Sequence, residues 1–169
     1  MRFPTDKKSA FISHIGMFTA VLAVLSFFET RLGFNFGVPG VKFGFSNIVI
    51  IIALTVFGFK TALCLTAAKI GFSFVFTGGM SDMIFTFFGS ISSLFSMFVI
   101  KKALGEKVSC IGMSAAGGFC HITAQYLTFG ALMKTAAVMR LYPLAAAISL
   151  VTAVIVGIIC NILLKRVYT

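Results

Sequence analysis

The residues that could do chemistry are five polar side chains set between or within long apolar runs. They are Lys42, Asn47, Lys69, His121 and Gln125. A lysine ammonium group can neutralise an anion, and an amide or an imidazole can fix a ligand's orientation by hydrogen bonds. These residue types predict a substrate-binding site for a small polar molecule, and they do not form a recognisable catalytic set.

Lys69 lies near the middle of the apolar run 60–77. An ionisable side chain at that depth in a membrane costs about 2.5–3.5 kcal/mol on insertion scales, so it usually faces the protein interior or a cavity and has a partner. We therefore expect Lys69 to bind a ligand or to form an ion pair inside the protein.

The run 109–131 is the most polar of the apolar runs. Its polar and small residues recur at steps of three and four, which places them on one face of a helix. They are Ser114, Gly117, His121, Gln125 and Thr128. His121 could simply donate to a backbone carbonyl, but His121 and Gln125 one turn apart above glycines favour a ligand surface. A single histidine without a second ligand at metal spacing predicts no metal site.

The segment 37–47 separates two apolar runs and contains Pro39, Lys42 and Asn47. Proline fixes φ and glycine reaches backbone conformations closed to other residues, so this segment is predicted to be a shaped loop. Lys42 and Asn47 would then lie at the start of the next helix, within reach of a site between helices.

Several kinds of catalysis are excluded by missing motifs. The chain has no GxxxxGK[ST] sequence for binding ATP, and its four acidic residues are too scattered for the carboxylate cluster that holds magnesium on a diphosphate. No serine or cysteine nucleophile has a matching histidine and acid. The sequence therefore predicts no enzymatic activity, no catalytic residues and no cofactor.

Composition identifies a membrane protein. The chain has 169 residues, of which 59% are hydrophobic and 11% charged, with a mean hydropathy of +1.08. A soluble domain would carry about a quarter charged residues. The net charge of +10 is explained by basic loops beside a membrane, which leaves nucleic acid an improbable partner.

Six runs are long enough to cross a bilayer, which needs about 20 mostly apolar residues. The predicted fold is therefore all-α, a single domain of six transmembrane helices covering residues 1–169. The predicted spans are 10–28, 43–59, 60–77, 81–100, 109–131 and 142–164.

The distribution of Lys and Arg between the spans predicts the orientation, because basic residues concentrate on the cytoplasmic side. One side would hold nine of them, namely Arg2, Lys7, Lys8, Lys60, Lys101, Lys102, Lys107, Lys165 and Arg166. The other would hold Arg31, Lys42, Lys134 and Arg140. Both termini are therefore predicted to be cytoplasmic.

Two further patterns concern packing. Ser13, Gly16, Ala20 and Ala23 form a stripe of small side chains, which either packs within the bundle or docks another membrane protein. The four cysteines lie inside apolar runs without paired spacing, and we expect buried free thiols.

The chain resembles the Gx transporter family, often labelled heptaprenyl diphosphate synthase component I. Ile122 stands where that family is expected to have asparagine, and Lys69 where it often has arginine. The resemblance covers nearly the whole chain. It rests on Glu29, Pro39-Gly40-Val41-Lys42-Phe43-Gly44, Asn47-Ile48, Gly78-Gly79 with Ser81, Gly117-Gly118-Phe119-Cys120-His121 and Gln125.

That family is similar to the substrate-binding S components of energy-coupling-factor transporters. The resemblance implies a six-helix membrane protein of the bacterial inner membrane with a pocket near its outer face, capped by the loop after the first helix. It also implies docking, partly through small residues of that helix, onto a membrane coupling subunit with two ATPases. Lys42 and Lys69 outweigh Asp82 and Glu29 near the expected pocket, which favours an anionic nutrient or cofactor precursor.

Two other interpretations stay open. The chain could be a non-catalytic membrane subunit of a prenyl diphosphate or quinone-pathway enzyme, whose acid-rich motifs would lie on a soluble partner. It could also be a membrane subunit of a flavin- or quinone-linked electron-transfer system, although no CxxCH haem-attachment motif is present.

Overall fold

The computed structural model describes residues 7–31, 43–105, 108–134 and 137–168, and all regular structure in these ranges is helical. The elements are α1 (Lys7–Arg31), α2 (Ser46–Val56), α3 (Phe59–Thr77), α4 (Met80–Leu104), α5 (Cys110–Met133), the 3₁₀ helix η2 (Ala137–Leu141) and α6 (Tyr142–Tyr168). Each of the six predicted spans overlaps one α-helix. The all-α prediction is thereby confirmed.

The predicted boundaries of the second span were wrong. The helix covers Ser46–Val56 rather than 43–59, and 11 residues rise about 17 Å, far less than the roughly 30 Å of a hydrocarbon core. Glycines bracket it at both ends, because Gly44 has φ +77° and Gly58 has φ +87°. Such angles stop an α-helix and favour glycine, since other residues are strained there.

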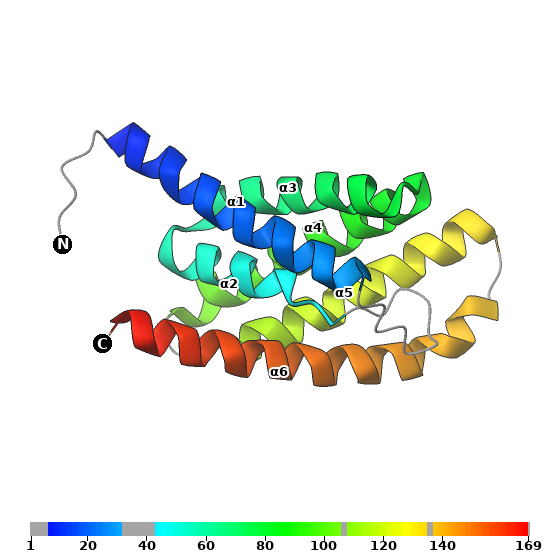
Figure 1. Cartoon of the computed structure of the whole chain (residues 1–169). Coiled ribbons are helices and arrows are strands. Elements are labelled where there is room, and N and C mark those ends of the chain that lie inside the picture. The colour runs from blue at the N-terminus through cyan, green and yellow to red at the C-terminus, as the bar shows by residue number, and fades with distance from the viewer. Residues whose placement is uncertain (1–6, 32–42, 106–107, 135–136, 169) are drawn as a thin grey trace.

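The helices run back and forth, so that the start of α1 and the end of α6 lie at the same end of the bundle (Figure 1). Helix α5 packs between α4 and α6, while α1 packs on α3 and α2. The short helix α2 therefore lies inside the bundle.

The core is centred on α2, whose side chains at Ile50, Ile51, Ala53 and Leu54 are almost completely buried. Its carboxyl end is capped from another helix, because Lys101 Nζ of α4 donates to Leu54 O at 2.7 Å and to Thr55 O at 3.2 Å. These bonds satisfy carbonyls that the end of a helix leaves without an internal partner. Helix α2 can thus end inside the protein.

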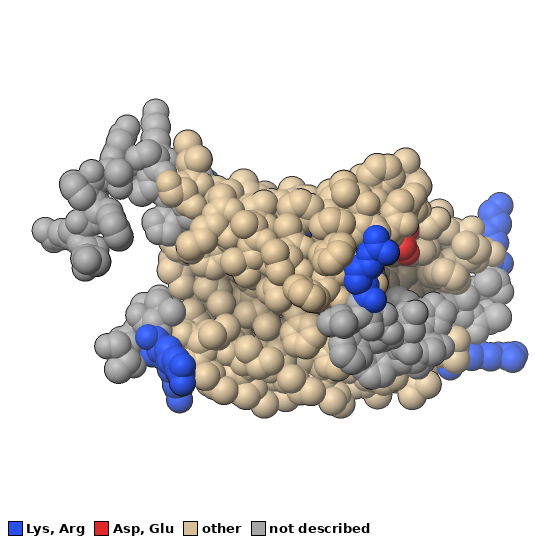
Figure 2. All heavy atoms as spheres, viewed as in Figure 1, with Lys and Arg blue, Asp and Glu red and all other residues tan. Residues whose placement is uncertain are grey.

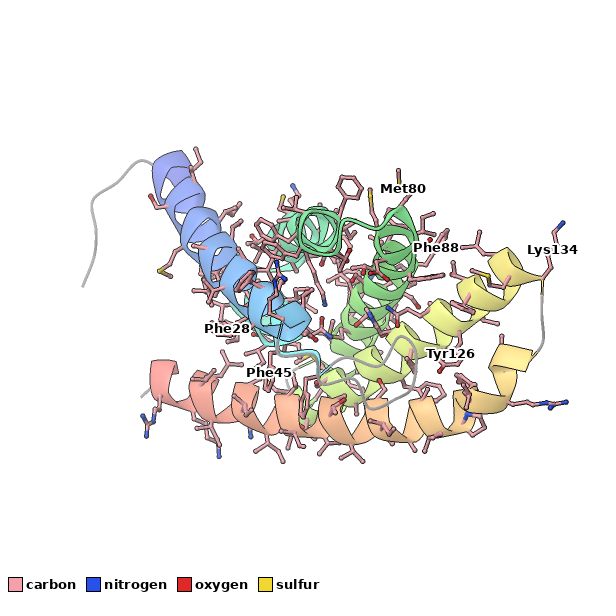
Figure 3. The ribbon with its side chains drawn as sticks, turned by 45° about the vertical axis from the view of Figure 1, so that its right-hand side comes forward. Phe28, Phe45, Met80, Phe88, Tyr126 and Lys134 are labelled. Atoms are coloured by element: carbon pink, nitrogen blue, oxygen red, sulfur yellow. The ribbon has the colours of Figure 1, made fainter. Side chains whose placement is uncertain are left out.

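Close contacts between α5 and α6 are made by small residues. A methyl group added at Gly118 would lie 2.6 Å from Ala153 Cβ, and one at Gly157 would lie 2.6 Å from Ile111 Cα. A second, smaller core lies farther along the same pair of helices, where Tyr126 packs with Ala145. Tyr126 lies between α5 and the start of α6 (Figure 3).

The outer surface is apolar over much of its area. Many large hydrophobic side chains are exposed, among them Val75, Phe95, Leu127 and Val151. The described part of the face shown in Figure 2 is largely uncharged, apart from basic side chains toward both ends and a basic and an acidic side chain right of its centre. Exposed apolar side chains on this scale need lipid as their solvent.

Among the described residues, three helices are long and apolar enough to cross a bilayer: Phe59–Thr77, Met80–Leu104 and Met139–Arg166. Helix α5 is not among them, because its polar residues lower its hydropathy. The chain is a multi-pass membrane protein.

Two packing predictions were tested by exposure. Cys110 and Cys160 are buried as expected, but the prediction was wrong for Cys64, which is exposed on α3. In the small-residue stripe of α1, Gly16 and Ala20 are exposed, and nothing lies within 4 Å of a methyl group added at Gly16. The outer part of this stripe therefore does not pack within the bundle.

Candidate functional site

A cavity of about 60 Å³ opens between the helices, bordered by residues of all six α-helices. One water molecule needs about 10–15 Å³ on this scale, so the cavity can hold several waters or a small polar ligand. Its walls are unusually polar for an apolar bundle. The hydroxyl-bearing residues that line it are Ser26, Ser46, Ser73, Thr86, Ser114, Ser149 and Thr152.

Four of the five residues predicted to bind substrate line this one cavity. Asn47 comes from α2, Lys69 from α3, and His121 and Gln125 from α5. The fifth, Lys42, lies outside the described residues. Residues from three helices are thus gathered around one space, and their role in binding stays a prediction.

Lys69 and Asn47 form the cationic part of the site. Lys69 Nζ donates to Asn47 Oδ1 at 2.5 Å, and Lys69 is half-buried. Asn47 is held in the first turn of α2, where its backbone N–H donates to Gly44 O at 2.9 Å. The partner of Lys69 in this contact is a neutral amide rather than the carboxylate of an ion pair.

Glu29 is a cavity residue that the sequence analysis did not include in the site. Its Oε1 accepts from Gly44 N at 2.5 Å, and its Oε2 accepts from Ser46 Oγ at 2.9 Å. A carboxylate at the amino end of a helix is stabilised by the helix dipole. Glu29 therefore joins the end of α1 to the start of α2, and it places a negative charge in the same cavity as Lys69.

The sequence did contain an indication that Glu29 belongs to the site. It is one of only four acidic residues, and it lies at the end of an apolar run. Asp82, which the sequence analysis weighed with Glu29, does not line the cavity. It lies in the first turn of α4 instead.

His121 and Gln125 form the α5 wall of the cavity. They pack against Gly89 of α4, which has no side chain and so leaves space for them. A methyl group at Gly89 would lie 2.8 Å from His121 Cε1 and 3.0 Å from Gln125 Cγ. Gln125 is 6% exposed, and within the described part of the chain its Oε1 accepts no hydrogen bond. The α4–α5 contact thus encloses an amide whose oxygen is directed to no protein donor.

Most of the hydroxyl groups that line the cavity are already hydrogen-bonded within the protein. Ser73 Oγ and Thr86 Oγ1 are 2.9 Å apart and join α3 to α4. Ser114 Oγ donates to Ala153 O at 2.6 Å, and Ser149 Oγ to Gly118 O at 3.1 Å, which joins α5 to α6. These hydroxyl groups join the helices that form the cavity walls, and they contribute less to ligand recognition than groups that are not already hydrogen-bonded within the protein.

An aromatic pair borders the cavity beside the start of α2. Phe43 lines the cavity, and its ring stacks on Phe45 with centroids 5.2 Å apart. Phe45 lies just before α2. The site therefore offers an apolar face next to Lys69, Asn47 and Glu29.

The arrangement suits non-covalent binding through one cation, one anion, an imidazole and amides. Among the described residues, no group of three or more His, Cys, Asp or Glu side chains could hold a metal ion. The geometry thus agrees with the binding interpretation that the residue types favour.

Comparison with known proteins gives one match. The family model described as heptaprenyl diphosphate synthase component I matches residues 18–163, which include every described residue named in the site. Neither the curated proteins nor the solved structures that were compared gave a match.

Proposed function

The chain belongs to the heptaprenyl diphosphate synthase component I family, and from this we propose that it is the substrate-binding membrane subunit of an uptake system. Its substrate is a small organic nutrient or a cofactor or quinone precursor. The observation that carries the proposal is the polar cavity inside an apolar bundle, lined by Asn47, Lys69, His121 and Gln125. Enclosed sites with a few convergent polar groups are typical of small-molecule binding.

The substrate carries an anionic group, a carboxylate or a phosphate. Lys69, oriented by Asn47, neutralises that group, and Lys42, outside the described residues, adds a second positive charge. The Glu29 carboxylate keeps its negative charge in the same cavity, but donors at the start of α2 engage both of its oxygens, so the anionic group of the substrate contacts Lys69 instead. The stacked pair of Phe43 and Phe45 covers an apolar part of the substrate.

The proposed topology has six crossings, with both termini in the cytoplasm of a bacterial inner membrane. The nine-to-four division of basic residues supports this orientation. The start of α1 and the end of α6 lie at one end of the bundle, which is consistent with an even number of crossings (Figure 1). The shortness of α2 is compatible with a crossing, because non-helical backbone is tolerated at membrane depth where protein buries it.

The proposed partners are a membrane coupling subunit and two ATPase subunits, since the chain carries no ATP-binding motif of its own. The exposed small residues Ser13, Gly16 and Ala20 on α1 support docking of another membrane protein there.

The test begins with mass spectrometry of small molecules retained through purification, followed by binding measurements with the molecule found. Lys69→Ala and His121→Ala are expected to weaken its binding at least about tenfold, the equivalent of about 1.4 kcal/mol. Thr128→Ala is the matched control, because Thr128 lies on α5 outside the cavity and bonds only to Ala124 O. Wild-type binding by both cavity variants would exclude this site.

A second candidate function is favoured by the description of the family itself. The chain would be a non-catalytic membrane subunit of a prenyl diphosphate synthase whose catalytic acids lie on a soluble partner. Copurification decides between the two functions: a soluble prenyltransferase supports this one, whereas a coupling subunit with ATPases supports uptake.

A further inference from the structure

The amide of Gln125 is a buried polar group of the cavity whose oxygen has no hydrogen-bond donor among the described residues. The side chain is 94% buried, given its 6% exposure, and it lines the cavity. No described residue donates to its Oε1. A buried acceptor without a partner costs about 1–3 kcal/mol, so a ligand that supplies the donor gains a contribution of that order.

Gln125 differs from the buried hydroxyl groups that also lack partners. Ser26 lines the cavity, whereas Thr61, Ser90 and Ser93 lie outside it, and none of these hydroxyls is hydrogen-bonded within the described ranges. A helical serine or threonine can rotate its hydroxyl onto the carbonyl one turn back, which removes the deficit locally. A glutamine amide is a larger planar group that cannot be satisfied so simply.

The packing around Gln125 restricts how far it can turn away. Its Cγ lies against α4 at Gly89, where an added methyl group would be only 3.0 Å away. The helix that carries Gln125 is itself fixed against α6 through Gly118 and Ala153. Contacts with α4 on one side of α5 and with α6 on the other therefore hold the Gln125 amide at the cavity wall.

We propose that Gln125 binds a planar, uncharged group of the ligand that presents a hydrogen-bond donor and an acceptor side by side, as a carboxamide, lactam or imide does. A glutamine amide has an acceptor oxygen and a donor nitrogen in one plane, so such a group can pair with both at once. A carboxylate could pair with the donor end alone, and its oxygen would oppose Gln125 Oε1.

This inference rests on the proposed binding function and divides the ligand into two parts. An anionic group lies toward Lys69 and Asn47, and the amide-like group lies toward Gln125 on the opposite wall, α5. The substrate class is thus an organic acid or phosphate that also carries an amide-type function.

The experiment measures thermal unfolding of the purified full-length protein in detergent with two probes of matched shape, benzamide and benzoate, and every protein tested carries Lys69→Met so that Lys69 cannot attract the carboxylate probe. Benzamide is expected to raise the unfolding temperature at concentrations at least about tenfold lower than benzoate, because a tenfold ratio corresponds to about 1.4 kcal/mol, within the range of one buried hydrogen bond. Equal or better stabilisation by benzoate, or no stabilisation by either probe, would overturn the assignment.

Two variants show whether the preference comes from Gln125. Gln125→Met keeps the length of the side chain without its amide, so the ligand-free protein should unfold at the same or a higher temperature, and the preference for benzamide should disappear. Thr128→Val is the matched control, because Thr128 lies on α5 outside the cavity and its hydroxyl bonds to Ala124 O, and it should keep the preference. A preference retained by Gln125→Met would contradict the proposal, and the comparison with Gln125 in place decides alone if that variant does not fold.

Failure of this inference can be told apart from failure of the proposed function. A retained molecule that carries an acid but no amide-type group, and that binds through Lys69 and His121, would reject the role of Gln125 and leave uptake standing. Absence of any binding that depends on the cavity residues would reject the uptake function as well.

Discussion

Helices α5 and α6 on one side and α1 on the other use glycine in opposite ways. At Gly118 and Gly157 a methyl group would lie 2.6 Å from atoms of the facing helix, whereas at Gly16 of α1 nothing lies within 4 Å. Glycine on α5 and α6 allows two backbones to approach, as small residues do between helices in membranes. Glycine on α1 leaves a shallow, outward-facing surface.

The cavity therefore has two kinds of wall. Close packing fixes α5, whereas hydrogen bonds attach α1. His121 and Gln125 lie on α5, which close packing holds in place. Glu29 lies on α1 and joins the cavity through hydrogen bonds to Gly44 N and Ser46 Oγ. Substitutions on the two sides should therefore differ in kind: packing changes should disrupt α5 and α6, and polar changes should loosen α1.

The largest effect is expected for Gly157→Ala. The new methyl group would lie 2.6 Å from Ile111 Cα and 3.1 Å from Cys110 O, and backbone atoms cannot move aside as a flexible side chain can. Overpacking of this kind costs about 1–3 kcal/mol, and we expect a value near 3 kcal/mol. Thermal unfolding in detergent measures the loss.

Gly16→Ala is the matched control for that substitution. Alanine favours a helix over glycine by up to about 1 kcal/mol, and the site is open, so stability should stay the same or rise slightly. Equal losses of stability in Gly157→Ala and Gly16→Ala would show that glycine has the same role on α1 as on α5 and α6.

Glu29→Ala is expected to have the next largest effect. It leaves Gly44 N–H and Ser46 Oγ without their acceptor at the start of α2, which costs about 2 kcal/mol. Hydrogen exchange should show faster exchange near Gly44 while the amides of α5 keep their protection.

Glu29→Gln tests whether the charge or only the hydrogen bonds of Glu29 matter. It can still accept at one oxygen, so it should lose about half of the stability that Glu29→Ala loses. Faster exchange in α5 that equals the change near Gly44 would show that the two walls are not independent.

The sequence predicted the helices and much of the site because both follow from local patterns. The lengths of the apolar runs placed all six α-helices, and the three- and four-residue spacing of Ser114, His121 and Gln125 placed them on one helix face. Lys69 was recognised because a charge inside an apolar run needs a partner.

What the sequence did not predict depends on contacts between distant residues. Helix α2 is short because Gly44 and Gly58 adopt positive φ and because Lys101, more than 40 residues away, caps its carbonyls. Glu29 joins the site through a residue 15 positions away, which no helical period can indicate. The exposure of Cys64 depends on which face of α3 its neighbours cover.

Gly44→Ala should have a smaller effect than Glu29→Ala on the same junction. Gly44 has φ +77°, a conformation that costs an L-residue about 1–2 kcal/mol. Its N–H can still donate to Glu29, so we expect a loss near 1 kcal/mol in thermal unfolding. A loss larger than that of Glu29→Ala would mean that backbone conformation, rather than the carboxylate, holds α1 to α2.

Gly89→Ala should have the smallest effect on stability and a clear effect on binding. The added methyl group would meet His121 Cε1 at 2.8 Å and Gln125 Cγ at 3.0 Å. Packing restricts both side chains here, but a side chain can still shift off its rotamer at a cost of about 0.5–1.5 kcal/mol, whereas the backbone atoms that face Gly157 cannot move aside. Because the displaced side chains are those that line the cavity, the preference for benzamide over benzoate should fall to near unity while the unfolding temperature changes by less than in Gly157→Ala. A variant that keeps the wild-type preference would show that Gly89 serves helix packing alone, and the α4–α5 contact would then belong with the structural glycines of α5 and α6.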